Sequence, residues 1–172
     1  ITLATPTVSL SAKTGMTYNG SSQAANTATV SPSAGGAITY TYYTDSGCSN
    51  GATTTAPKAA GTYYVKASAA AVANKTNIAY SSCVAHTIAQ KAVTVTAGST
   101  SRAWNNSALT NSTCTAGSNQ LLTGHTVSCT MTSGSTITTA GSVDNVINTV
   151  TIKDSSNNDV TSNYNVTKTK GS

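Results

Sequence analysis

Apolar side chains alternate with Ser or Thr in two stretches that lie about half the chain apart. The first stretch is VSLSA, which begins at Val8, and the second is VTVTA, which begins at Val93. A period of two residues is typical of a β-strand that buries one of its faces. Each stretch therefore predicts a strand near the start of its half of the chain.

The match between the halves extends in both directions. Upstream, Thr2-Leu3-Ala4 aligns with Thr87-Ile88-Ala89; downstream, Tyr18-Asn19-Gly20 aligns with Trp104-Asn105-Asn106. The offset is 85 residues (87 − 2) for the first pair and 86 (104 − 18) for the second, and half of the 172 residues is also 86. The chain is therefore predicted to contain an internal repeat. Asn and Gly tolerate positive φ, so both aromatic motifs are predicted turns, with each ring packed in the core beneath its turn.

Composition indicates an all-β chain. Charged residues make up only 8%, there is no Glu, and clusters of Gly, Asn and Ser separate runs rich in Thr, Val and Tyr. Such runs favour short strands, and the scarcity of charged helix formers argues against long helices. The predicted strands lie near 6–12, 26–31, 37–44, 61–69 and 84–90 in the first half, and near 91–97, 124–132, 146–153 and 161–168 in the second.

Several motifs resemble the YDG-type, or MBG-type, Ig-like repeat of bacterial surface proteins. In the second half they are Ala108-Leu109-Thr110, Gly124-His125-Thr126-Val127, Asp159-Val160-Thr161 and Tyr164, with Trp104-Asn105-Asn106 in place of the family's aromatic-Asp-Gly motif. In the first half they are Tyr18-Asn19-Gly20, Tyr40-Thr41-Tyr42-Tyr43 and Gly61-Thr62-Tyr63-Tyr64-Val65. The resemblance implies two small tandem β-sandwich domains, Ig-like or β-grasp-like. It also implies a structural role in an extracellular stalk, adhesin or filament at the bacterial cell surface.

The family pattern closes with a strand that is absent after Lys170-Gly171-Ser172 but resembles Ile1-Thr2-Leu3-Ala4. We therefore expect residues 1–4 to be the closing strand of a preceding unit, 5–90 to form the first domain, and 91–172 the second. Residues 1–4 of the next unit would complete that second domain. The predicted partner is an identical neighbour, joined head to tail either in a covalent tandem array or by donation of a strand between subunits.

The four cysteines are predicted to form one disulfide in each half, Cys48 with Cys83 and Cys114 with Cys129. None lies in a C-x-x-C pair, which disfavours zinc and thioredoxin-type chemistry. Disulfides imply an oxidising compartment. The alternative is four reduced thiols buried in the core.

Catalytic chemistry is not expected. The two histidines, His86 and His125, lie in strand-like runs with no acid beside them, and four Asp without Glu leave little scope for paired carboxylates. DSSNND, at 154–159, has the oxygen atoms of a weak calcium site, but a solvated turn is the preferred interpretation. We expect a protein that is not an enzyme and that needs no cofactor or metal.

Binding surfaces offer one rival function. Five tyrosines could present an aromatic surface to a glycan or a host protein: Tyr40, Tyr42, Tyr43, Tyr63 and Tyr64. The net charge of +5 comes from scattered Lys and Arg and a shortage of acids, which argues against nucleic-acid binding. No apolar run approaches the ~20 residues of a membrane span, so membrane insertion is not expected.

Overall fold

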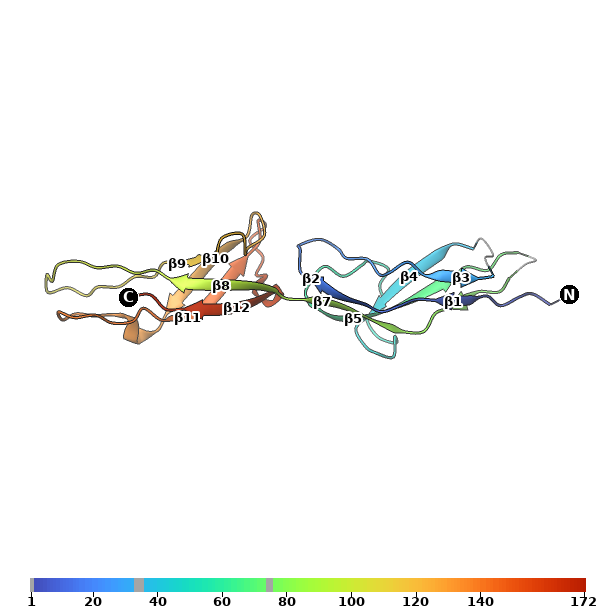
Figure 1. Cartoon of the computed structure of the whole chain (residues 1–172), viewed down its shortest axis with the longest axis horizontal. Coiled ribbons are helices and arrows are strands. Elements are labelled where there is room, and N and C mark those ends of the chain that lie inside the picture. The colour runs from blue at the N-terminus through green and yellow to red at the C-terminus, as the bar shows by residue number, and fades with distance from the viewer. Residues whose placement is uncertain (1, 33–35, 74–75) are drawn as a thin grey trace. The chain divides into compact units, whose positions relative to one another are not determined.

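The computed structural model describes residues 2–32, 36–73 and 76–172 and shows an all-β chain (Figure 1). The chain divides into two compact units, Ile1–Ala89 and Gln90–Ser172. The helical part of the described residues consists of two short 3₁₀ turns, η1 (Ser133–Ser135) and η2 (Thr161–Asn163), and neither is long enough to cross a membrane. The predicted all-β class, with one disulfide in each half, is confirmed.

The first unit, called unit 1, pairs its strands in two sheets. The smaller sheet pairs β1 with β3, and the larger has the order β2-β7-β5-β4, with β6 paired to β5. Strands β2 and β7 run parallel, and the other pairs are antiparallel. The strands are β1 (Thr7–Ser9), β2 (Lys13–Thr17), β3 (Thr29–Ser31), β4 (Ile38–Tyr43), β5 (Gly61–Ala69), β6 (Ala79–Tyr80) and β7 (Val84–Ala89).

The core of unit 1 lies between these two sheets. Val8 of β1 packs in one buried cluster with Ala67 and Ala69 of β5, and Leu10 and Tyr40 pack against the cluster. From Val65 to Ala69 of β5 every second side chain is buried, as the alternation in this part of its sequence predicts. Unit 1 is therefore a sandwich of a small sheet on a large one.

The predicted strand over 6–12 is in fact interrupted, and the chain changes sheets inside it. Strand β1 ends at Ser9 and β2 begins at Lys13, so the chain crosses from one sheet to the other between them. The Asn26 amide holds this crossing by donating to Ser11 Oγ and to the Ala12 carbonyl, both at 3.1 Å.

The second unit, called unit 2, has a three-stranded sheet, β12-β8-β9, and a two-stranded sheet, β10-β11. Its last strand, β12, runs parallel to its first, β8, just as β7 runs parallel to β2 in unit 1. Strand β12 begins at Tyr164 and not at 161, because residues 161–163 form the 3₁₀ turn η2. The strands are β8 (Lys91–Ala97), β9 (Cys114–Ala116), β10 (Thr126–Met131), β11 (Ile147–Lys153) and β12 (Tyr164–Thr169).

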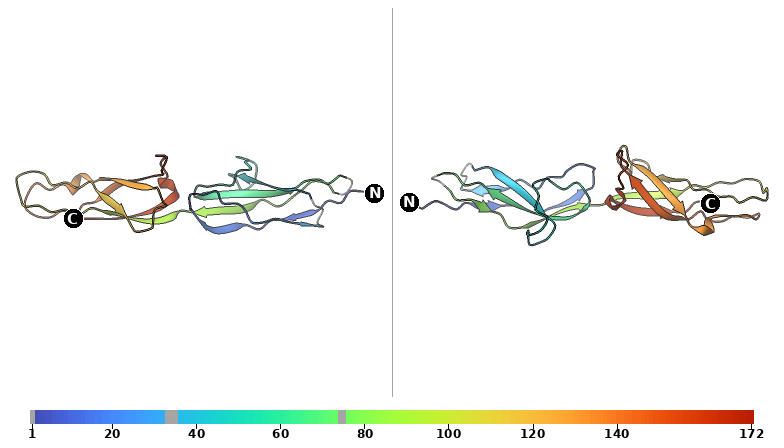
Figure 2. Two further views of the ribbon diagram at one scale, coloured as in Figure 1. Left: turned by 90° about the horizontal axis from the view of Figure 1, so that it is seen from above. Right: turned by 180° about the vertical axis from the view of Figure 1, so that it is seen from behind.

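The disulfides have the predicted pairing. Cys48–Cys83 joins the loop after β4 to the residue before β7, across a sequence separation of 35 residues. Cys114–Cys129 joins β9 to β10, and hence the two sheets of unit 2, across 15 residues. Figure 2 shows each unit from two further sides. The two bridges indicate that the protein matures in an oxidising environment.

Candidate binding groove in the second unit

Two long loops extend from one end of the unit 2 sheets. One connects β8 to β9 over residues 98–113, and the other connects β10 to β11 over residues 132–146. Leu109 and Ile137 pair across the loops, with backbone N···O distances of 2.9 and 3.3 Å. The Arg102 guanidinium closes the tip of the first loop by donating to the carbonyls of Ser107 and Ala108. The loops are thus held in place by backbone pairing and by one buttressing side chain.

Asn145 ties three segments together at the base of the loops. Its Nδ2 donates to the carbonyls of Gly98 at 2.8 Å and Asn111 at 2.9 Å, and its backbone exchanges two hydrogen bonds with Gly171. Gly171 approaches so closely that a Cβ there would lie 2.6 Å from the carbonyl oxygens of Ala97 and Gly98. The segment after β12 is therefore clamped between the two loops.

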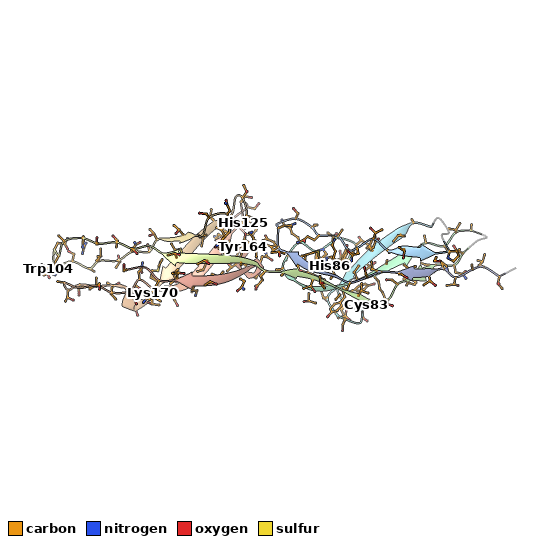
Figure 3. The ribbon with its side chains drawn as sticks, viewed as in Figure 1. Cys83, His86, Trp104, His125, Tyr164 and Lys170 are labelled. Carbon is orange, nitrogen blue, oxygen red and sulfur yellow. A yellow bond between two sulfur atoms is a disulfide. The ribbon has the colours of Figure 1, made fainter. Side chains whose placement is uncertain are left out.

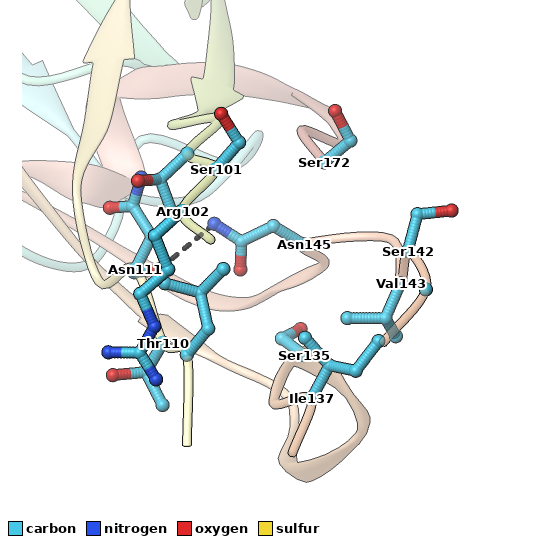
Figure 4. A pocket seen from close by; sticks show the side chains of 13 residues that line it. Ser101, Arg102, Thr110, Asn111, Ser135, Ile137, Ser142, Val143, Asn145 and Ser172 are labelled. Carbon is cyan, nitrogen blue, oxygen red and sulfur yellow. Dashed lines mark hydrogen bonds between the residues drawn. The ribbon is translucent and has the colours of Figure 1, made fainter. Parts of the chain in front are cut away.

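Between the loops lies a cavity of about 210 Å³, lined by side chains from 100–111 and 135–145 and by Ser172 (Figure 4). Half-buried Leu109, Ile137 and Val143 give it apolar walls. It adjoins a second hollow of about 170 Å³, which shares Arg102, Leu109 and Ile137 and reaches Trp104. We call this combined space the loop groove.

One polar atom in the loop groove lacks a partner. Asn145 is 4% exposed, yet its Oδ1 accepts no hydrogen bond from the described residues. A buried acceptor left unsatisfied costs about 1–3 kcal/mol. In Figure 4 the Nδ2 of Asn145 is bonded toward Asn111, and the oxygen lies on the side of Ser135 and Ile137. The loop groove therefore favours an occupant that brings a hydrogen-bond donor.

The backbone edges of the loop groove are also open. Thr100 N donates to the Ser172 carbonyl at 2.8 Å, which is the last ladder bond on that side. Beyond it, no hydrogen bond within the described residues uses the backbone of Ser101, Arg102, Ser142 or Val143. Two facing rows of unpaired amides and carbonyls form a template for an added strand.

Trp104 stands exposed at this end of unit 2 (Figure 3). Its side chain is 65% exposed, so the prediction that its ring packs in the core is wrong. The corresponding Tyr18 of unit 1 is 3% exposed, and its N–H donates to the Ala89 carbonyl at the end of β7, at 2.8 Å. A strand lies beside Tyr18, whereas none of the described strands lies beside Trp104, and this difference accounts for the exposure.

The turns after the two aromatic residues are alike. Asn19 Oδ1 accepts from Ser21 N at 2.9 Å, and Asn105 Oδ1 accepts from Ser107 N at 3.2 Å. Positive φ follows at the next position in each, 77° at Gly20 and 60° at Asn106. The local turn chemistry is thus preserved although the packing is not.

The N-terminal segment is largely unpaired within its own chain. Leu3 is 44% exposed, and Thr2 and Leu3 belong to no ladder. Ala4 makes a single bridge with Thr76 of unit 1, and its carbonyl accepts from the Asn77 amide at 2.9 Å. Ile1, the first residue of the predicted assembly strand, lies outside the described residues. Most of this segment is thus exposed to a partner.

The five tyrosines of the rival prediction are largely engaged inside unit 1. The hydroxyls of Tyr40 and Tyr42 accept from the amides of Ala28 and Ala25, at 2.8 and 2.9 Å. Tyr63 donates its hydroxyl to the Ala59 carbonyl, and Tyr43 and Tyr64 pair across β4 and β5. A cavity of about 230 Å³ lies beside Tyr43 and Tyr63, with Lys58 at its wall.

The histidines and Asp154 make contacts with neighbouring residues of their own unit. His86 is fully buried and in edge-on contact with Tyr42, and burial lowers the pKa of its imidazole. His125 Nδ1 lies 2.8 Å from the Tyr164 hydroxyl. In the DSSNND turn, Asp154 accepts from the amides of Ser156 and Asn158. The side chain and backbone of Asn158 are the main reason that the pKa of Asp154 is lowered.

Sequence reasoning missed Asn145 and the loop groove. An isolated Asn in a chain rich in Asn carries no distinguishing signal, and the loops have no periodicity. In the part of the chain that the structure describes, no three His, Cys, Asp or Glu side chains gather as metal ligands do. Comparisons with protein-family models, with curated proteins and with solved structures found no match to this chain, so the resemblance to surface repeats rests on its residues alone.

Proposed function

We propose that this chain is a non-enzymatic structural repeat unit of a bacterial extracellular stalk, adhesin or filament, in which copies join head to tail. The observation that carries the proposal is the internal repeat. Thr2-Leu3-Ala4 has the pattern of Thr87-Ile88-Ala89. Those three residues are the end of β7, which is the final strand of unit 1 along the chain. A segment with the sequence of a closing strand thus precedes the first domain.

The contact that this implies is heterologous, because the head of one copy meets the tail of the next. Heterologous contacts that do not close into a ring generate open filaments. A covalent tandem array and a polymer of separate subunits share the same contact, so the proposal holds for both. The disulfides support an extracellular location, and the family resemblance supports the bacterial surface.

Assembly of the purified, oxidised chain tests the proposal. We expect sedimentation velocity to show oligomers that grow with protein concentration, and electron microscopy to show linear particles. A chain that lacks residues 1–4 is the control and should remain monomeric. The proposal fails if the complete chain stays monomeric at high concentration and its reading frame contains no further copy.

A second candidate function is adhesion through unit 1. The cavity beside Tyr43, Tyr63 and Lys58 favours it, because aromatic rings and a cation together suit a glycan or an acidic peptide. Saturable binding on a glycan array by the monomeric control chain, lost in Tyr43→Ala, would favour adhesion over a purely structural role.

A further inference from the structure

We infer that the loop groove receives residues 2–4 of a second copy of this chain as an added β-strand, paired on both of its sides. This inference rests on the proposed function, and it assigns the site and register of the head-to-tail contact. One edge of the site is the backbone of Arg102 and Trp104, and the other is the backbone of Gly141 and Val143.

The register follows first from unit 1. There β2 runs parallel to β7, with Thr17 opposite Ala89 and the Tyr18 amide donating to the Ala89 carbonyl. The repeat relates Tyr18 to Trp104 and Ala89 to Ala4. Carried over to unit 2, the same bond joins the Trp104 amide to the Ala4 carbonyl of the second copy, which exchanges for it the bond that this carbonyl accepts from Asn77 in its own unit.

The local geometry of unit 2 is consistent with the same register. The Thr100 amide donates to the Ser172 carbonyl, in continuation of the parallel pairing of β8 with β12. In a parallel ladder the bonds recur every two residues on both strands. Trp104 therefore faces the fourth position beyond Ser172 along this path. Ala4 occupies that position when Ile1 of the second copy takes the place directly after Ser172, and this is the placement in which the two registers agree.

The opposite edge continues in the same way. Asn145 and Gly171 exchange two backbone hydrogen bonds as an antiparallel pair. Two residues before Asn145 on this ladder is Val143, which lies opposite the first position beyond Ser172. Two residues further is Gly141, which lies opposite the third position and hence opposite Leu3. An inserted strand would pair with both edges and so close the open sheet edge of unit 2.

The side chains suit this docking. Ile88, the counterpart of Leu3, is 1% exposed, whereas Leu3 is 44% exposed in its own chain. Leu109 and Ile137 give the loop groove an apolar lining for Leu3. Residues 2–12 carry no charge, so docking desolvates no ionised group of the segment.

Trp104 provides the readout, because it is the one Trp of the sequence. The probe is a synthetic peptide of residues 1–12, ITLATPTVSLSA, titrated into the full oxidised chain that carries Leu3→Asp to silence its own segment. We expect a saturable blue shift of the fluorescence and slower exchange of the Trp104 amide. A peptide that carries Leu3→Asp should bind at least tenfold more weakly.

Two valines of the same loop give matched variants of the acceptor. Val143 lines the loop groove. Val146 does not line it and is 39% exposed. Val143→Asp should abolish peptide binding and Val146→Asp should preserve it, with near-ultraviolet circular dichroism to verify that both fold. Equal binding by the two variants, or equal binding of the two peptides, overturns the inference.

The possible results distinguish a failure of the proposed site from a failure of the proposed function. If the unmodified chain assembles while the peptide leaves Trp104 exposed, the site is wrong and head-to-tail assembly proceeds by another contact. If the peptide binds as described but the chain stays monomeric and its reading frame holds no further copy, the site stands and the proposed function fails.

Discussion

Tyr18 and Trp104 occupy matching positions of the repeat but have different surroundings. Tyr18 is buried against the end of β7, while Trp104 is 65% exposed. Tyr18→Ala should lower the free energy of unfolding by about 3 kcal/mol, since it removes a buried aromatic side chain. Trp104→Ala should change it by less than about 0.5 kcal/mol in the monomer, as for other exposed positions. Urea denaturation of the monomeric control chain measures both, and equal effects would contradict this assignment.

His86 gives unit 1 a dependence on pH. Burial lowers the pKa of its imidazole below the ordinary value of 6.5, so the unfolded chain takes up a proton at a higher pH than the folded chain does. The free energy of unfolding should therefore fall as the pH drops below about 6.5 and level off below the folded-state pKa. The lowered pKa values of Asp45, Asp154 and Asp159 add a separate loss of stability at a more acidic pH, near and below 3.8.

Denaturation at a series of pH values measures this dependence. Its control is His86→Leu, in which the decline that begins near pH 6.5 should disappear while the more acidic decline remains. If the decline that begins near pH 6.5 has the same size in His86→Leu, another group causes it.

At the scale of elements, alternation predicted those strands that bury one face. β5 and β8 have the predicted bounds, and β11 begins one residue later than predicted. In β8 the apolar residues Val93, Val95 and Ala97 recur every second residue. β2 contains Lys13 and Gly15 and lacks this alternation, and β6 has only two residues, so neither carries a signal of its own. β9 was not predicted either, although adding the repeat offset of 85 residues to the bounds of β3 gives the bounds of β9.

The two disulfides should contribute unequally to stability. On the chain-entropy model, a closed loop of 15 residues contributes about 3 kcal/mol and one of 35 residues about 4 kcal/mol. Replacing Cys48 and Cys83 with Ala should thus cost slightly more than replacing Cys114 and Cys129. Denaturant titrations of the two double variants test the order, and a reversed order would show that the Cys114–Cys129 link between the sheets of unit 2 outweighs loop length.

Glycine at 171 is required by close packing. A Cβ there would meet two backbone carbonyl oxygens at 2.6 Å, whereas a Cβ at Gly134 would have no atom within 4 Å. Gly171→Ala should displace the segment after β12 and speed the amide exchange of Asn145, which pairs with it. Gly134→Ala is the matched control and should leave that exchange unchanged. Unchanged exchange in both variants would contradict the clamped arrangement.

At the scale of the whole molecule, charge determines how assembly responds to salt. Each copy carries a net charge of +5, while residues 2–12 are uncharged and Arg102 is the one ionisable side chain lining the loop groove. Like-charged copies repel one another over distances comparable to the Debye length, about 10 Å at 0.1 M salt. No ion pair between side chains forms in this contact, so added salt removes none.

Salt should therefore strengthen head-to-tail association. Sedimentation velocity from about 20 mM to about 500 mM sodium chloride should show larger oligomers at higher salt, because screening removes the repulsion and leaves the apolar and backbone contacts intact. Replacing Lys66 and Lys153, two half-buried lysines on strands outside the loop groove, with Gln should reproduce part of this effect at low salt. Dissociation at high salt would instead show that opposite charges on the two copies hold the contact together. The uncharged residues 2–12 would then not be the main part of the head-to-tail contact.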